Sequence, residues 1–197
     1  MKKFFCLILA FAVSLGLFTG FGKTAASADA DAGETTENKF VAAPLAVLEI
    51  DDENSLAEID EENVDVAIMS FTLTGEIADK EGNALTNAAE LATKLALKNI
   101  AMIYRIENSV ILEAFKAYYE ASGLKDAAVA SSSSSVLIAA AEIKNLNVYY
   151  IAEDISDRDL AAVAITQANA FGAQTIILEG ETNYDTVRYI QSRLKSV

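Results

Sequence analysis

The hydrophobic pattern alternates between short apolar segments and longer segments with helical spacing, which predicts a parallel α/β fold. The clearest example is Ile100–Ser135, where a helix separates two apolar segments, Ile100–Ile106 and Ala127–Ala130. That helix carries four apolar residues on one face, Ile111, Phe115, Tyr118 and Tyr119. Asn108 or Ser109 is suited to begin it and Gly123 to end it. A strand–helix–strand unit of this kind favours parallel strands.

The same alternation continues in both directions along the chain. Six strands are predicted, at Leu45–Ile50, Val64–Leu73, Ile100–Ile106, Ala127–Ala130, Val148–Ile151 and Thr175–Leu178. Capping pairs are predicted at four helix starts, Ser55 with Glu58, Asn87 with Glu90, Ser156 with Asp159 and Thr182 with Asp185. The segment 75–82 is predicted to be a loop.

Inward-facing residues are predicted for the helices by the same spacing. They are Ala88, Leu91, Ala92 and Leu95; then Val136, Leu137, Ala140, Ala141 and Ile143; then Leu160, Val163, Ala164, Ala168 and Phe171; and finally Val187, Ile190 and Leu194.

About six βα units predict an α/β fold with a parallel, barrel-like sheet over residues 41–197. An open doubly wound sheet is the other arrangement that fits this order of elements. A complete (β/α)8 barrel would continue with a seventh strand where the sequence ends. We therefore expect an incomplete (β/α)8 barrel, which a protein partner or an additional domain could complete, or the front part of a longer gene product.

The N-terminus has the pattern of a secretory signal peptide over residues 1–28. Lys2 and Lys3 precede the uncharged run Phe4–Phe21, and a small-residue cleavage pattern ends at Ala28. An uncleaved membrane anchor is the alternative for an apolar run of this length. Residues 29–40 are predicted to be an acidic linker. We expect a secreted or cell-surface protein.

The strongly negative net charge of the chain limits the kinds of molecule that it is expected to bind. The chain has 15 Lys and Arg against 29 Asp and Glu and a net charge of −14. Cleavage after Ala28 would remove three lysines and no acid, which leaves 12 against 29 and a net charge of −17. Nucleic acids and anionic membranes bind positively charged surfaces, which so acidic a chain does not offer. We therefore expect neither nucleic acid nor an anionic membrane surface as a partner. The only cysteine, Cys6, lies in the signal segment, so the mature chain would have no disulfide.

Three short motifs resemble those of the glycerophosphodiester phosphodiesterase barrels, in the phospholipase-C-like phosphodiesterase superfamily. They are Glu53-Asn54-Ser55-Leu56, Leu73-Thr74, and Ser131-Ser132 followed by Val136-Leu137. The resemblance implies a barrel, and in that family two histidines and a divalent cation perform phosphodiester hydrolysis.

The sequence departs from that family at the catalytic positions, because it contains no histidine. Ala43-Pro44-Leu45 stands at the H-R-G motif of the family, Ile68-Met69-Ser70 at its E-x-D motif, and Asp79-Lys80-Glu81 near its second histidine. No side chain at these places titrates near neutral pH at its ordinary pKa. If the resemblance holds, it implies a barrel that has lost this catalysis.

Ligands of parallel βα folds bind at the carboxyl ends of the strands, and carboxylates recur there. The candidate catalytic residues are Glu107, Glu153 and Glu179, and the candidate ligands for Ca²⁺ or Mg²⁺ are Glu107, Glu153 and Asp154. Two carboxylates of this kind are also what a glycosidase needs. In so acidic a chain, such residues can equally be helix caps and solvated loop residues.

Two further residues are candidates for ligand binding, Arg105 and Ser132. Arg105 ends an apolar strand and could hold an anionic group, or form an ion pair with Glu107 or Glu153. Ser132 lies in the serine run 131–135, which could donate to a phosphate or sugar, or cap the next helix.

Two functions follow as hypotheses. The first is a secreted, non-catalytic or degenerate glycerophosphodiester phosphodiesterase-like barrel that binds a ligand or partner at the cell surface. The second is a metal-assisted hydrolase of phosphodiesters or glycosides.

Overall fold

The computed structural model describes residues 7–9, 46–61, 64–124 and 127–194. These residues belong to one compact unit formed by Met1–Phe11 and Leu45–Val197. The predicted signal segment and acidic linker otherwise fall outside the described residues and stay predictions.

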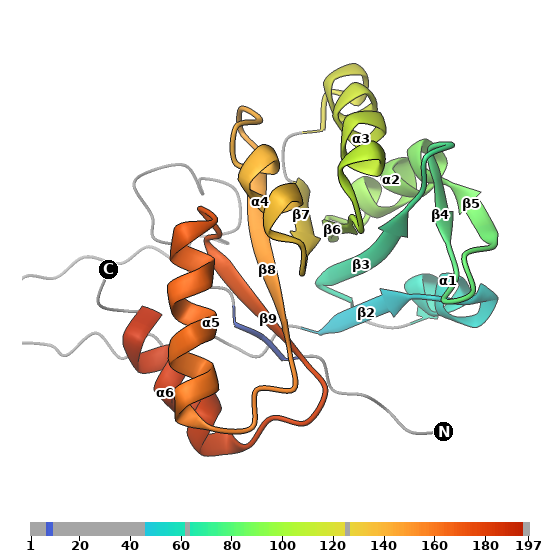
Figure 1. The fold of residues 1–197 in the computed structure, drawn as a ribbon. Helices are drawn as coiled ribbons and strands as arrows, with labels where there is room; N and C mark the ends of the chain where they lie inside the picture. Colours follow the sequence, from blue (N-terminus) through green and yellow to red (C-terminus); the bar gives the residue numbers. More distant parts are fainter. Residues whose placement is uncertain (1–6, 10–45, 62–63, 125–126, 195–197) are drawn as a thin grey trace, which may run out of the picture. The chain divides into compact units, whose positions relative to one another are not determined.

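The centre of the fold is a sheet whose six parallel strands follow one another in chain order (Figure 1). These strands are β2 (Val47–Ile50), β3 (Val66–Phe71), β6 (Ala101–Arg105), β7 (Ala127–Ser131), β8 (Asn147–Glu153) and β9 (Thr175–Glu179). All six predicted strands are confirmed within a few residues of the expected bounds. Each parallel strand pairs with the next one along the chain.

In the described part of the chain, six helices connect or follow the parallel strands. They are α1 (Glu53–Glu61), α2 (Ala88–Leu97), α3 (Ser109–Ser122), α4 (Ser134–Ala140), α5 (Arg158–Ala170) and α6 (Tyr184–Leu194). The α/β class and the mostly parallel sheet that the hydrophobic pattern predicted are therefore confirmed. Among the described residues, no helix has both the length and the apolar character needed to cross a membrane.

The predicted loop at 75–82 is wrong in part, because its residues 76–78 form the first strand of an antiparallel hairpin and only the rest is a loop. Strands β4 (Glu76–Ala78) and β5 (Ala84–Asn87) pair with each other, and β4 pairs with the last two residues of β3. Because β2 pairs with Val66–Met69, the hairpin occupies the same edge of β3 beyond the end of β2. The hairpin therefore lies beside the carboxyl ends of β2 and β3.

A short strand near the N-terminus, β1 (Leu7–Leu9), pairs antiparallel with β9. It lies within the segment predicted to be a signal peptide. In the described chain the outer edge of β9 is thus covered by backbone pairing, which removes an exposed edge.

The helices pack on one face of the sheet. The main core on this face joins strand residues to α2, α3 and α4, and a second core joins β8 and β9 to α5 and α6. A third cluster lies on the opposite face and, among the described residues, consists of strand residues alone, such as Ile68, Ile103 and Ile177; we call this the helix-free face of the described chain. The two faces follow from the alternation of side chains along each strand.

Helix α3 is anchored by an aromatic cluster that reaches into the sheet. Phe115 is fully buried, and its ring centroid lies 4.9 Å from that of Tyr104 and 5.3 Å from that of Phe71. Tyr118 and Tyr119 of the same helix complete the cluster. Because Phe71 ends β3 and Tyr104 precedes Arg105 on β6, the cluster fixes the two strands on which the site below depends.

Two of the predicted helix caps are confirmed, those of α2 and α3. Asn87 accepts hydrogen bonds from the amides of Ala89 and Glu90, and Asn108 accepts from those of Val110 and Ile111. Gly123 ends α3 in the left-handed conformation. All four predicted inward residues of α2 are buried.

The other three predicted caps are wrong, and in each an Asp or Asn nearby acts instead. Asp52 accepts from the Ser55 amide at 2.7 Å, while Ser55 Oγ accepts from the Asp52 amide. Asp157 begins α5, and Asn183 accepts from the amide of Thr186 at the start of α6. Asx side chains are at least as good as Ser and Thr at this position.

The buried faces of three helices differ in part from the prediction. Helix α5 packs through Ala161, Ala164 and Ala168, whereas Leu160 and Val163 are exposed. Helix α4 buries Val136, Leu137 and Ala140 as predicted but ends there. Helix α3 buries Leu112 in addition to Phe115 and Tyr119, with Ile111 and Tyr118 only partly buried.

Candidate functional site

The helix-free face of the sheet changes from apolar to polar at the carboxyl ends of its strands. Val47 is followed on the same face by Glu49, and Ile68 by Ser70. The same step leads from Ile103 to Arg105, from Ile151 to Glu153, and from Ile177 to Glu179. We call these five polar residues the rim. The apolar cluster below the rim is buried, so the rim is the part of this face that can meet a ligand.

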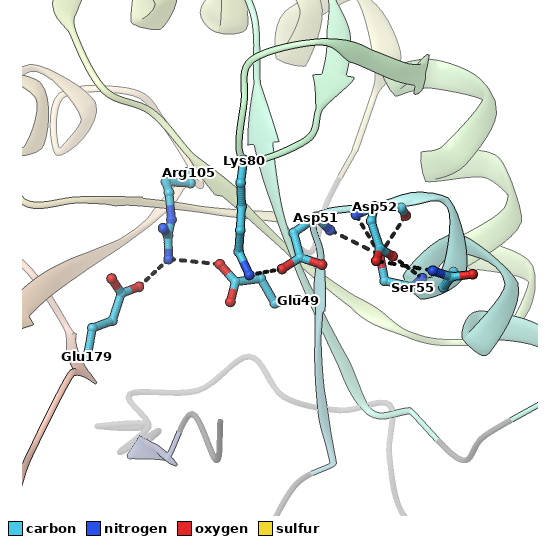
Figure 2. Close-up of polar contacts among 8 residues, drawn as sticks. Glu49, Asp51, Asp52, Ser55, Lys80, Arg105 and Glu179 are labelled. Atoms are coloured by element: carbon cyan, nitrogen blue, oxygen red, sulfur yellow. Dashed lines mark hydrogen bonds and ion pairs between the residues drawn. The ribbon is translucent and has the colours of Figure 1, made fainter. Parts of the chain in front are cut away.

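Arg105 joins the first and last parallel strands through ion pairs (Figure 2). Its Nη2 lies 3.4 Å from Oε1 of Glu49 on β2, and it also donates to Oε1 of Glu179 on β9. In a flat sheet β2 and β9 would be five inter-strand spacings apart, about 24 Å. That distance exceeds the combined reach of two glutamate side chains that contact one nitrogen. The sheet is therefore curved toward its helix-free face.

Glu179 is the rim residue whose carboxyl has a shifted pKa. Burial raises the pKa of its carboxyl, Arg105 opposes this rise, and the nearby carboxylates of Glu49 and Glu153 add to it. The repulsion and the partial loss of solvent together outweigh the attraction of the guanidinium. Glu179 thus has a higher affinity for a proton in the folded protein than in the unfolded chain.

This pKa shift predicts how Glu179→Gln changes the pH dependence of stability. A raised pKa means that the carboxyl contributes its stability fully below its ordinary value of 4.5 and loses it as the pH rises through the folded pKa. We expect the free energy of unfolding of the wild type to fall relative to that of Glu179→Gln between pH 4 and pH 7. Urea unfolding at four pH values measures the difference. Glu181→Gln, at an exposed position two residues further along the chain, controls for the lost charge, and a difference that runs in the opposite direction would contradict the assignment.

A cavity of about 440 Å³ opens at the carboxyl ends of β2, β3 and β6, under the β4–β5 hairpin. This volume is within the range of small-molecule sites. Its floor is formed by residues whose side chains belong to the cores, Ile68, Met69 and Phe71, and its accessible apolar side chains are Leu73 and Ile111. Its charged lining consists of five carboxylates, Glu49, Asp51, Asp79, Glu81 and Glu107, and two cations, Lys80 and Arg105. The formal charge of the lining is therefore −3.

The hairpin presents Lys80 to this cavity. Asp79 closes the turn by accepting from the amide of Asn83 at 2.7 Å and from its side chain at 2.9 Å, bonds that lower the pKa of the Asp79 carboxyl. Lys80 pairs with Asp51, and this hydrogen bond raises the pKa of the lysine (Figure 2). Both cations of the cavity thus already contact carboxylates.

The structure brings some of the predicted site residues together and leaves others apart. Arg105 and Glu179 are in contact, and Glu153 is close enough to raise the pKa of Glu179. Glu107 is exposed and lines the cavity. The partners predicted for Arg105 were Glu107 or Glu153, whereas the ion pairs observed are with Glu49 and Glu179.

The two remaining candidates, Asp154 and Ser132, lie in loops where the contacts nearby belong to the local fold. The amide of Asp154 donates to the carbonyl oxygen of Glu179 at 2.9 Å, and its side chain lies over Gly180. Ser132 is exposed in the turn after β7, while its neighbour Ser131 is buried and donates to the carbonyl oxygen of Ile106. Within the described part of the chain, no group of three or more His, Cys, Asp or Glu residues is arranged to hold a metal.

Sequence reasoning did not single out two residues that the structure places at the site, Asp51 and Lys80. Asp51 is one of several acidic residues that directly follow the first predicted strand, and Lys80 lies in the predicted loop at 75–82. Recognition of the hairpin would have placed Lys80 beside the ends of β2 and β3. The turn glycine Gly82 and the Asp79–Asn83 spacing are the signals that point to it.

Comparisons of the chain with protein-family models, with curated proteins and with solved structures find no match. The fold and the site define a class: an α/β protein with a mostly parallel, curved sheet and an acidic cavity at the carboxyl ends of its strands. The resemblance to the glycerophosphodiester phosphodiesterases stays a prediction.

Proposed function

We propose that this chain is a non-catalytic ligand-binding module with the fold of an incomplete (β/α)8 barrel. The chain order of the parallel strands and the placement of the helices on one face both support this proposal. A doubly wound sheet would instead reverse its strand order and carry helices on both faces.

The stagger of the strands gives a second line of support. Pairing leads from Glu49 through Ile68, Ile103 and Ala128 to Asn147 on β8. Glu153, the rim residue of β8, lies six residues beyond Asn147. The strands of a barrel are tilted, so residues at the same height shift along the pairing register from one strand to the next. Around a complete eight-stranded barrel of this type the shift totals about eight residues.

The observation that carries the function is the cavity itself, which has the volume of a small-molecule site and whose two cations already pair with carboxylates. The chain has no histidine, and both lining cations pair with carboxylates. A phosphodiester would need a free guanidinium or ammonium group, or a metal, to offset its charge. A cavity of about 440 Å³ with accessible apolar side chains such as Leu73 still suits a small molecule. Secretion and a cell-surface location remain part of this proposal through the predicted signal peptide.

A hydrolase is the second candidate, favoured by one observation. Glu179 has a raised pKa and shares Arg105 with Glu49, so the rim holds one carboxyl suited to donate a proton and another beside it. Retaining glycosidases use two carboxyl groups of this kind about 5 Å apart. In this rim the guanidinium lies between the two carboxylates, where the scissile bond of a glycoside would have to be.

Turnover and binding assays on the purified chain distinguish the two candidates. We expect no product from glycerophosphocholine or from p-nitrophenyl glycosides, with or without Ca²⁺ and Mg²⁺. We expect hits from an NMR fragment screen to shift amide signals around the cavity, at Ser70, Thr72 and Gly82. Product formation that is lost in Glu179→Gln would establish the hydrolase, and hits that map elsewhere would contradict the proposed binding site. Calorimetry with Ca²⁺ and Mg²⁺ alone tests whether either ion binds.

A further inference from the structure

We propose that the cavity takes a small organic cation, an ammonium group on an apolar body, which binds by displacing Lys80 from Asp51. This inference rests on the proposed ligand-binding function and names the chemistry of its ligand. It follows from the charge of the lining, from the unequal exposure of Lys80 and Asp51, and from the accessible apolar side chains of the lining.

The charge of the cavity favours a cation over an anion. Five carboxylates and two cations line it, so a negative potential remains after Lys80 and Arg105 are counted. Arg105 already contacts Glu49 and Glu179, so it is not free to receive an anionic ligand. An anion would therefore meet uncompensated carboxylates, which makes its binding unfavourable.

Asp51 and Lys80 differ in how firmly the fold holds them. The Asp51 side chain is 23% exposed and that of Lys80 is 65% exposed. The amide of Asp51 donates to Ser55 Oγ at 3.0 Å, and Ser55 itself is buried in the first turn of α1. Lys80 reaches Asp51 from the hairpin along a flexible side chain (Figure 2). Lys80 can therefore move into solvent at little cost, whereas Asp51 stays in the cavity.

The lysine ammonium thus occupies the position that a ligand ammonium would take. Both groups offer three donors to a carboxylate, so the exchange replaces one ion pair with an equivalent one. The ligand gains what Lys80 lacks, because its apolar body can contact the two accessible apolar side chains of the lining, Leu73 and Ile111. Leu73 is 59% exposed and Ile111 is only partly buried.

Three isosteric probes test the charge requirement on the full chain. Pentylammonium, pentanol and pentanoate have nearly the same apolar body and differ in the charge of the end group. We expect pentylammonium to bind most tightly in calorimetry and to shift the amide signals of Asp51 and Lys80. Tighter binding of pentanol or pentanoate at the cavity would overturn the cation assignment and leave the ligand-binding function intact. No binding by any of the three would overturn the inference, and a fragment screen without cavity hits would then count against the function as well.

Two substitutions test the displacement. Lys80→Gln removes the competing ammonium and is expected to tighten pentylammonium binding about three- to fivefold, the factor expected for one exposed ion pair. Asp51→Asn removes the proposed partner and is expected to weaken binding about tenfold or more. Lys144→Gln, which removes an equal charge at an exposed position outside the cavity lining, should leave the affinity nearly unchanged.

The double variant separates displacement from a general effect of charge. If Lys80 competes for Asp51, Lys80→Gln should give no gain in affinity when Asp51 is already asparagine. If Lys80 acts only through the field of the cavity, the two effects will add and the displacement will be refuted. A weaker affinity in Lys80→Gln alone would refute it directly.

Discussion

Phe115→Ala is expected to lower the free energy of unfolding by about 3–5 kcal/mol, the range for removal of a fully buried aromatic side chain. Phe115 has no exposed surface, and four aromatic rings surround it, those of Phe71, Tyr104, Tyr118 and Tyr119. The cavity left by the substitution would be lined by large rings that cannot easily collapse into it. Urea unfolding followed by circular dichroism measures the loss.

Val110→Ala is the matched control for this prediction. Val110 lies on the same helix but is 62% exposed, so its replacement should change stability by less than about 0.5 kcal/mol. A loss below about 1 kcal/mol for Phe115→Ala would show that the aromatic cluster does not hold α3 against the sheet. A large loss would support the view that the rim depends on this cluster, since Phe71 and Tyr104 lie beside Ser70 and Arg105 in sequence.

Much of the fold could be predicted from sequence because each parallel strand is a compact apolar segment and each helix has a regular period. In α2, one apolar face and one good cap coincide, and the prediction is confirmed residue by residue. In α5 the prediction is right for Ala164 and Ala168, which are buried, but wrong for the two large residues Leu160 and Val163, which are exposed. The helix packs through its alanines, because small side chains allow it to lie close to its neighbours.

The hairpin and the rim contacts could not be predicted for a different reason. Strand β4 has three residues of mixed polarity, too few to show an alternating pattern. The partners of Arg105 come from positions 49 and 179, and only the curvature of the whole sheet brings them to β6. Sequence reasoning identified Arg105 and Glu179 as candidates separately, but it could pair Arg105 only with carboxylates expected close to it.

Arg105→Met is expected to lower the free energy of unfolding by about 2 kcal/mol at low salt. The side chains of Arg105 and Glu179 are 27% and 25% exposed, so their ion pair is only partly buried. Loss of one partner costs about 3–5 kcal/mol in a fully buried pair and about 0–1 kcal/mol in an exposed pair, and we expect a value between these limits. The loss arises chiefly because Glu49 and Glu179 would then face each other, with Glu153 nearby, and no cation between them. Urea unfolding at pH 7 measures it, and added salt should reduce it by screening the repulsion.

The double variant Arg105→Met with Glu179→Gln tests where that cost comes from. If it comes from an uncompensated carboxylate, the second substitution should restore most of the lost stability, because Glu179 already disfavours its charged form in the wild type. The loss in Arg105→Met should likewise shrink as the pH falls from 7 toward 4.5, since protonation of the Glu179 carboxyl, whose pKa is raised in the folded protein, removes its repulsion with the neighbouring carboxylates. A loss that persists at acidic pH and in the double variant would mean that Arg105 stabilises the sheet through packing of its aliphatic stem. In that case the ion pairs would not be what holds β2 and β9 to β6, and the curvature of the sheet would have to be maintained by the apolar cluster beneath the rim.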